Sequence, residues 1–213
     1  MYIPRHFEET RVDVLHELIR AEPFGALVTL GAGGLEANHV PFELDAAAGP
    51  LGTLRAHVSR ANGVWQAGRA DVEALAIFQG PQRYVTPSWY PTKAETGKVV
   101  PTWNYVVVHA YGPIRVIDDP AWLRAHVGRL TDRHEADRER PWQVSDAPED
   151  YVAAQVRGIV GIEIEVTRLA GKWKVSQNRT AKDAEGVSSG LKEQGDAAAL
   201  TMAQWVDARR PME

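Results

Sequence analysis

Short segments with strand periodicity, separated by glycine and proline, occupy most of the sequence and restrict its fold more than any other feature. They follow one amphipathic helix, which is predicted over residues 8–21 because its apolar side chains recur at helical spacing. Strands are predicted at residues 24–30, 35–44, 51–58, 72–79, 103–117, 159–169 and 172–176. A helix followed by many strands that are joined by short turns favours an antiparallel α+β barrel over alternating βαβ units.

Helices and loops are expected at defined places between and after these strands. Residues 87–101 are expected to form a loop, because three prolines and one glycine interrupt them. Residues 180–189 are expected to be flexible. Further helices are predicted at residues 59–68, 120–138, 149–157 and 191–209, with Ser59 as the N-cap of the first.

Composition excludes several classes of protein. The chain has 213 residues, of which 44% are hydrophobic, so it can bury a core in one domain or in one domain with a helical appendage. It contains no cysteine, which excludes disulfides, thiolate catalysis and cysteine-based zinc sites. No apolar run is long enough to span a bilayer, and the first residues lack the apolar stretch of a secretory signal. We therefore expect a cytoplasmic protein, and a bacterial cytoplasm fits this composition.

The charge of the chain argues against tight, direct binding to nucleic acid, which depends on basic surfaces. The net charge is -4 and the sequence pI is about 6.0. The most basic segment, residues 124–140, carries five arginines, but acidic residues between them favour a solvated helix face. The sequence contains no clear helix-turn-helix either.

Residues 55–62 form a candidate anion-binding turn. A strand that runs into the N-terminus of a helix leaves backbone N–H groups free to bind a phosphate. Arg60 adds a positive charge, and His57, Ser59 and Asn62 add hydrogen-bonding groups. An N-capped helix with solvated arginines explains the same spacing, and it is the more common outcome.

A second candidate segment lies at residues 78–90. Gln79 leaves a predicted buried strand, where an amide without a partner is costly. Ser88, Trp89 and Tyr90 follow in a loop, so this surface offers stacking and hydrogen bonding to a flat heterocycle. Aromatic packing within a hairpin is an equally good interpretation.

A third candidate is the start of the strand predicted at 103–117. Asn104 lies there between Trp103 and Tyr105. Tryptophan and tyrosine are also common in core and interface strands, so both interpretations remain open. The seven histidines show no spacing typical of a zinc site, which leaves metal or haem binding as the weaker hypothesis.

The order of these motifs along the chain resembles that of the PaiB family of FMN-binding negative transcriptional regulators. Gly63 is a departure, because the family is expected to have proline after Arg-Ala-Asn, although glycine permits the same turn. The segments that carry the resemblance are residues 1–7, 38–42, 78–81, 88–90, 99–105, 108–112 and 174–179.

The resemblance implies a single FMN-binding split-barrel domain over residues 1–213, with a flexible loop and a helical tail over 180–213. It also implies a homodimer with FMN at the interface between the subunits. By position, the phosphate would be bound by Arg60 with Thr53, His57 and Asn62. The remaining contacts that the resemblance implies are Gln79, Ser88, Trp89, Trp103, Asn104, Gln177, Asn178 and Arg179, the last five from the partner chain.

Two functions remain as hypotheses. The resemblance implies negative regulation of transcription, directly on DNA or through a partner protein. The alternative is a flavin-dependent oxidoreductase, since split barrels of this type also include flavin reductases and oxidases. No catalytic side chain is expected in either case, because a flavin carries out redox chemistry itself and the protein positions it.

Overall fold

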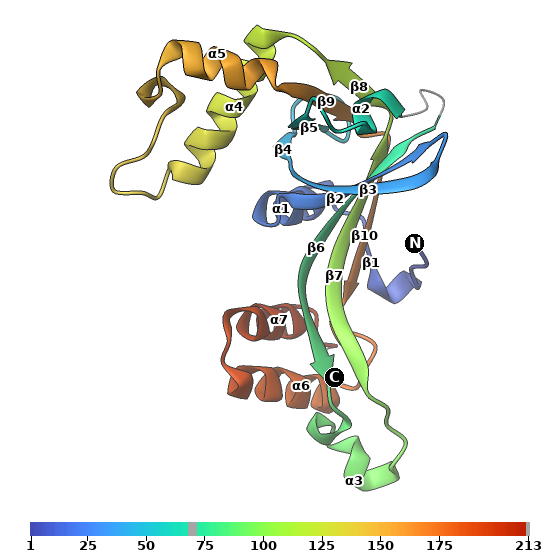
Figure 1. Ribbon diagram of the computed structural model, residues 1–213. Coiled ribbons are helices and arrows are strands. Elements are labelled where there is room, and N and C mark those ends of the chain that lie inside the picture. The colour runs from blue at the N-terminus through green and yellow to red at the C-terminus, as the bar shows by residue number, and fades with distance from the viewer. Residues whose placement is uncertain (68–71, 212–213) are drawn as a thin grey trace. The chain divides into compact units, whose positions relative to one another are not determined.

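The computed structural model describes residues 1–67 and 72–211 (Figure 1). Within them, one sheet has the strand order β1-β10-β7-β6-β2-β3 and a second has the order β4-β5-β9-β8. The strands are β1 (Glu8–Glu9), β2 (Phe24–Gly31), β3 (Gly34–Pro41), β4 (Glu43–Asp45), β5 (Thr53–Ser59), β6 (Ala74–Val85), β7 (Thr102–Gly112), β8 (Ile114–Ile117), β9 (Ile159–Glu165) and β10 (Arg168–Lys174). The helices are α1 (Val12–Ala21), α2 (Val64–Ala67), α3 (Thr92–Thr96), α4 (Pro120–Glu135), α5 (Glu149–Arg157), α6 (Ala181–Gln194) and α7 (Ala197–Ala208).

The strand pairings agree with the predicted α+β class. β2 pairs antiparallel with β3 and with β6, and β5 pairs antiparallel with β4 and with β9. β8 is antiparallel to β9, and β1 is antiparallel to β10. None of the described helices is both long enough and apolar enough to cross a membrane.

The chain divides into two compact units, each built from separate segments of the sequence. The first unit comprises Met1–Ala21, Gln79–Val108 and Ala170–Glu213. The second unit comprises Glu22–Phe78 and His109–Leu169. We describe each unit by itself.

In the first unit, α1 and α7 pack against the strands through glycines. A Cβ atom added to Gly171 of β10 would lie 2.2 Å from Cδ2 of Leu15 in α1. One added to Gly80 of β6 would lie 2.8 Å from Cδ1 of Leu18 in α1 and 3.5 Å from Cη2 of Trp205 in α7. Glycine in a strand allows such a close approach, so both helices cover the same face of these strands.

In the second unit, α4 and α5 lie together and α4 packs on β9 (Figure 1). The contact between the helices is built from the buried side chains of Leu123, Val152 and Val156. A Cβ atom added to Gly161 of β9 would lie 2.4 Å from Cζ3 of Trp122. Gly161 therefore makes room for the indole of α4 on the sheet.

Several helices and strands begin or end at other residues than predicted. The first helix begins at Val12 rather than residue 8, because Glu8 and Glu9 pair with β10 instead. The helix predicted at 59–68 is reduced to α2, and Ser59 ends β5 rather than capping it. Residue 68 lies outside the described residues. The strand predicted at 159–169 is divided between β9 and β10, which belong to different sheets.

Two segments predicted as loops contain helix. Residues 87–101 hold a 3-10 turn at Pro87–Trp89 and the short helix α3. Residues 180–189, which the sequence predicted as a flexible segment, hold the N-cap Thr180 and the start of α6. The side chain of Thr180 accepts a hydrogen bond from the backbone N–H of Asp183, which is a typical helix N-cap.

The C-terminal helices form a pair (Figure 1). The sequence predicts one helical tail over 191–209, whereas α6 ends at Gln194 and α7 begins at Ala197. Gly195, which follows α6, has a φ of 73°, the left-handed conformation that ends many helices. Asp196 then accepts hydrogen bonds from two backbone N–H groups at the start of α7.

Replacing Gly190 of α6 by alanine should destabilise the protein, although alanine is normally the better helix former. The new methyl group would lie 2.3 Å from Cε2 of Trp89. Overpacking of this kind costs about 1–3 kcal/mol, which exceeds the roughly 1 kcal/mol that alanine contributes to a helix. The free energy of unfolding in urea measures the effect.

Gly128→Ala is the matched control, because no described atom lies within 4 Å of a Cβ atom added at this position of α4. That variant should be more stable than the natural protein by up to about 1 kcal/mol. If Gly190→Ala were stabilised to the same extent, the packing of Trp89 on α6 would be wrong.

Candidate functional site

The first unit carries a group of cations, on β10 and just after it, that no carboxylate of the described residues neutralises. Lys172 and Lys174 are two residues apart, so they lie on the same face of the strand. The side chain of Lys172 is buried, and its Nζ donates to the carbonyl oxygen of Tyr2 at 3.1 Å and lies 5.3 Å from the ring centre of Tyr105. The Nζ of Lys174 donates to the carbonyl oxygen of Trp103 at 2.6 Å.

The positive charges of this group affect one another, as the pKa of Lys174 shows. Burial, with the nearby charges of Arg179 and Lys172, lowers the pKa of Lys174 from its ordinary value. Arg179 lies with its guanidinium carbon 4.8 Å from the ring centre of Tyr90. Within the described residues, none of these three cations forms an ion pair with a carboxylate. An anion would therefore find positive charges here that no carboxylate of the described residues neutralises.

Exposed aromatic side chains lie in the same unit. The rings of Tyr84 on β6 and Trp103 on β7 are 6.0 Å apart at 70°, an edge-to-face pair. Both are about half exposed, at 46% and 53%. Val100, three residues before Trp103 in the sequence, is 62% exposed. We call the Tyr84–Trp103 pair, together with Val100, the Trp103 patch.

Asn104 and Gln177, two of the predicted site residues, fix the turn that follows β10. Asn104 is buried, and its Nδ2 donates to Oγ of Ser176 at 2.9 Å. Ser176 has a φ of 68°, which is unusual for a residue with a side chain. Gln177 accepts from the backbone N–H of Val175 at 2.8 Å and donates to the carbonyl oxygen of Trp173. These contacts set the direction in which the chain leads to Arg179.

The predicted residues of 79–89 are not gathered at one place. Trp89 packs against α6. Its backbone lies next to Gly186 and its indole lies next to Gly190. Ser88 is exposed and lies 3.5 Å from Nζ of Lys93. Gln79 is exposed on β6. Trp89 thus supports the unit, and Asn178, which is exposed next to Arg179, is the more accessible of the predicted polar residues.

Arg60, the predicted phosphate ligand, forms an ion pair in the second unit. Its Nη1 and Nη2 bind the two carboxylate oxygens of Asp118 at 3.0 and 2.6 Å. Its Nε donates to the carbonyl oxygen of Arg157 at 2.9 Å. The pKa of Asp118 is lowered by these hydrogen bonds from Arg60. The helix expected after Ser59 is only four residues long, so it adds little to an anion site.

Thr53 and Asn62 form hydrogen bonds within the second unit. Oγ1 of Thr53 donates to the carbonyl oxygen of Ala48 at 2.9 Å. Nδ2 of Asn62 donates to Oδ1 of Asn38 at 2.7 Å, and the backbone N–H of Val64 donates to Oδ1 of Asn62 at 3.0 Å. Asn62 therefore connects the two motifs that carry Asn38 and Arg60.

His57 belongs to a histidine pair that the sequence did not reveal. Its ring centre lies 5.3 Å from that of His126 in α4. Nδ1 of His126 lies 3.2 Å from Oε2 of Glu43, while Nε2 of His126 and Nδ1 of His57 are buried without a hydrogen-bond partner among the described residues. Burial lowers the pKa of His126 to about 4, and it also lowers the pKa of His57. No periodicity or spacing connects residues so far apart in the sequence.

Comparison with known proteins identifies the family of the chain. A family model described as "Putative FMN-binding domain" matches residues 1–168. The chain belongs to this family. Membership identifies FMN as the cofactor, and the cationic and aromatic side chains of the first unit offer what an aromatic anion of this kind requires: N–H donors without a carboxylate partner and exposed rings.

Relatives of this FMN-binding family occur in fungi and bacteria. Uncharacterized proteins of Emericella nidulans and Aspergillus fumigatus are 37% and 35% identical, and each match covers 100% of this chain and 99% of the relative. The protease synthase and sporulation protein PAI 2 of Bacillus subtilis is 28% identical over 97% of both chains. This match confirms the resemblance to the PaiB family, and the fungal relatives leave the expected bacterial source open.

Solved structures of similar fold confirm the predicted split-barrel fold. The flavocytochrome Anf3 of Azotobacter vinelandii has a TM-score of 0.57 at 12% identity, covering 81% of this chain and 72% of its own. The FAD and haem binding protein of Mycobacterium smegmatis has a TM-score of 0.57 at 14% identity, covering 78% and 73%. At such identities the likeness concerns the fold alone.

The buried histidine pair should make stability depend on pH. The pKa of His126 is about 4 in the folded protein, whereas the ordinary value for histidine is 6.5, so the unfolded chain binds the proton more readily between these values. Stability should therefore be complete above pH 6.5, fall by about 3 kcal/mol as the pH falls to 4, and fall no further below it on this account. His57, whose pKa is also lowered by burial, should likewise make the folded protein less stable as the pH falls.

The measurement is the free energy of unfolding at a series of pH values. His126→Phe should flatten the dependence between pH 6.5 and 4. His134→Phe, which changes an exposed histidine of the same helix, should leave it as it is. Equal pH dependence in both variants would contradict the assignment to His126.

Proposed function

We propose that this protein is an FMN-binding negative regulator of transcription of the PaiB type, which acts through a partner protein rather than by tight contact with DNA. The observation that carries the flavin part is the group of unpaired cations beside exposed aromatic rings among the described residues of the first unit. Family membership supplies the identity of the ligand. The regulatory part rests on the relation to the PaiB family.

The first unit would hold FMN with two kinds of side chain. Lys174 and Arg179 would bind anionic oxygens of the ligand, since charge-assisted hydrogen bonds are the strongest available to a phosphate. Trp103 would stack on the flat ring system and exclude water from it. The bound flavin would supply redox chemistry, and the neighbouring positive charges would stabilise the electron-rich form of its ring.

Arg60 of the second unit remains the alternative ligand for the phosphate, together with Thr53, His57 and Asn62. Its guanidinium already forms four hydrogen bonds, two of them with Asp118. A phosphate would have to replace this carboxylate, which is a competitor of the same charge sign. Because Lys174 and Arg179 bind no such carboxylate among the described residues, we test them first in the experiment below.

The Trp103 patch supports a homodimer. Tyr84, Val100 and Trp103 are large apolar side chains that are all about half exposed or more. Aromatic residues are enriched in the centres of protein interfaces. We infer that a second copy of the chain covers this patch and that the flavin is enclosed there.

The arginines of α4 argue against direct binding to DNA. Arg124 forms a double hydrogen bond with Glu149, at 2.8 and 2.7 Å. Arg129 forms another with Glu43, at 2.7 and 3.1 Å. Phosphate contacts would have to break these pairs, so the most basic segment of the sequence offers little counterion release. A regulator with this surface acts more effectively by binding another protein.

A flavin-dependent oxidoreductase is the second candidate function. It is favoured by the same group of cations, because positive charge near a flavin stabilises the electron-rich form of the ring. The two candidates share the flavin site and differ in what the flavin serves.

Lys174→Met should weaken FMN binding by about tenfold or more, because it removes a charge-assisted contact. Fluorescence titration of the flavin-free protein with FMN measures the dissociation constant. Lys182→Met is the matched control, since Lys182 is in the same unit but is paired with Glu95. Equal affinities in the two variants would remove Lys174 from the site, and a loss only in Arg60→Met would transfer the phosphate to the second unit.

Two assays on the FMN-loaded protein separate the candidate functions. A regulator that acts through a partner should show neither rapid NAD(P)H oxidation nor a salt-resistant shift of promoter fragments. Multiple turnovers of NAD(P)H would favour the oxidoreductase. A shift with a steep salt dependence that is lost in Arg124→Gln would show that α4 binds DNA directly.

A further inference from the structure

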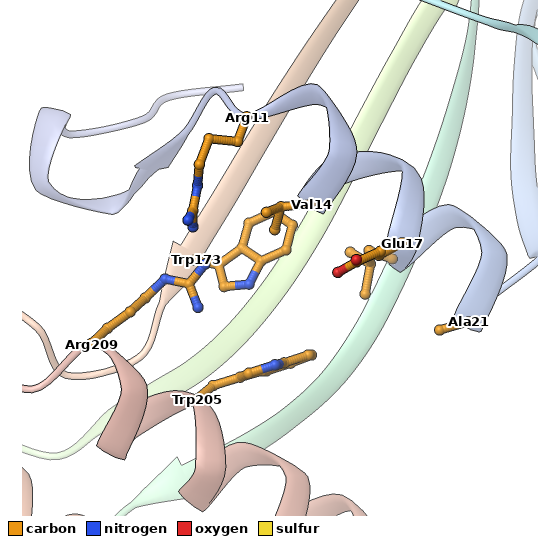
Figure 2. A pocket seen from close by; sticks show the side chains of 8 residues that line it. Arg11, Val14, Glu17, Ala21, Trp173, Trp205 and Arg209 are labelled. Atoms are coloured by element: carbon orange, nitrogen blue, oxygen red, sulfur yellow. The ribbon is translucent and has the colours of Figure 1, made fainter. Parts of the chain in front are cut away.

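A cavity of about 320 Å³ lies in the first unit between α1, β10 and α7 (Figure 2). Glu17 of α1 lines the cavity, as does Arg11, which directly precedes this helix. β10 contributes Trp173, α7 contributes Trp205, and Arg209 lines the cavity from the end of α7. All of these residues belong to the same compact unit. Cavities of this size are typical of small-molecule sites.

Two indoles form the apolar part of the cavity. The ring centres of Trp173 and Trp205 are 6.5 Å apart, and their planes are tilted by 59°. Trp173 is 3% exposed, so its position is fixed by packing. A flat ring that enters the cavity would contact mainly the indole of Trp205, which is only partly buried, because Trp173 leaves little surface accessible.

Two guanidinium groups lie at one end of the cavity and are held by one carboxylate. Glu9 is 7% exposed and accepts from Nε and Nη2 of Arg11 at 2.9 and 2.7 Å, and from Nη2 of Arg209 at 2.8 Å. The hydrogen bonds from Arg11, and then that from Arg209, lower the pKa of Glu9 to about 2 against the effect of its burial. The oxygens of Glu9 are thus occupied, whereas each guanidinium has N–H groups left over.

The remaining donors determine which charge the cavity accepts. The guanidinium carbon of Arg209 lies 5.6 Å from the ring centre of Trp173, so a ligand that stacks on the indoles has a cation at its edge. Figure 2 draws Glu17 on the side of the cavity opposite to the two guanidinium groups. Glu17 is exposed, and it would disfavour a second negative charge at that end.

We propose that this cavity binds a small planar aromatic carboxylate, with the ring packed against the indole pair of Trp173 and Trp205 and the carboxylate on Arg209 and Arg11. The site is separate from the proposed flavin surface. Trp173 alternates along β10 with Lys172 and Lys174, so they project from opposite faces of the strand. A regulator that carries such a site has a place to bind a signal molecule.

Calorimetry with three probes of the same ring tests the class of ligand. Indole-3-acetate, indole-3-ethanol and tryptamine carry a negative, a neutral and a positive group. The full-length protein should bind indole-3-acetate about tenfold more tightly than indole-3-ethanol, because only the carboxylate forms hydrogen bonds in which both donor and acceptor are charged. Tryptamine should bind most weakly. Tighter binding of tryptamine, or no binding of any probe at millimolar concentration, would overturn the proposal.

Charge variants test the residues. Arg209→Gln should weaken the binding of indole-3-acetate by about tenfold and leave the affinity for indole-3-ethanol nearly unchanged. Arg210→Gln is the matched control, because Arg210 is the next residue and does not line the cavity. Glu17→Gln should strengthen the binding of indole-3-acetate and weaken the binding of tryptamine. If Arg209→Gln and Arg210→Gln bound the carboxylate equally, the assignment of Arg209 would be wrong.

The same titrations with saturating FMN test the separation of the two sites. Indole-3-acetate should shift the indole N–H signals of Trp173 and Trp205 in NMR spectra whether or not FMN is present, with Trp→Phe variants assigning them. Competitive loss of these shifts would mean that the cavity is part of the flavin site. A protein that binds indole-3-acetate but no FMN would contradict the proposed function and leave this inference intact.

Discussion

Strand β10 directs successive side chains to opposite faces, and the candidate sites of the first unit depend on this alternation. One face carries Trp173, which the helices α1 and α7 approach. The other face carries Lys172 and Lys174, which lie near aromatic rings and form no ion pair with a carboxylate of the described residues. A single strand thus separates a helix-covered cavity from a cationic surface, and a shift of one residue in its register would exchange the two.

Pairing of charges, rather than the total charge, distinguishes the cations of β10 from Arg60 of the second unit. The chain has a net charge of -4, yet a positive group on β10 remains unpaired within the described residues. In the second unit, Arg60 is neutralised by Asp118, and Glu163 binds both Arg55 and Arg115. The exposed pair of Arg60 and Asp118 contributes little stability, but such pairs remove cations from anion binding. The flavin proposal therefore concentrates on the first unit.

Periodicity and turn chemistry predicted the elements well where the signal is local. The hairpin of β2 and β3, the break at Gly112 and the helix that begins at Pro120 follow from glycine, proline and alternating apolar residues. The prediction was wrong for α6, although Thr180 and Asp183 form an N-cap that the sequence displays. The site was only partly predictable. Trp103 and Arg179 lie in motifs, whereas Lys172 and His126 gain their surroundings from distant segments.

The sequence by itself determined the class of fold, the family and the cofactor, because these depend on local patterns and on motifs in a fixed order. Only the tertiary structure decided which charged groups are free. Arg60 and Lys174 are both basic in the sequence, but Asp118 lies within hydrogen-bond distance of the first, and neutral groups accept from the second. The reason is physical: hydrogen bonds and ion pairs act over a few ångströms in space, and folding brings together residues that the sequence separates.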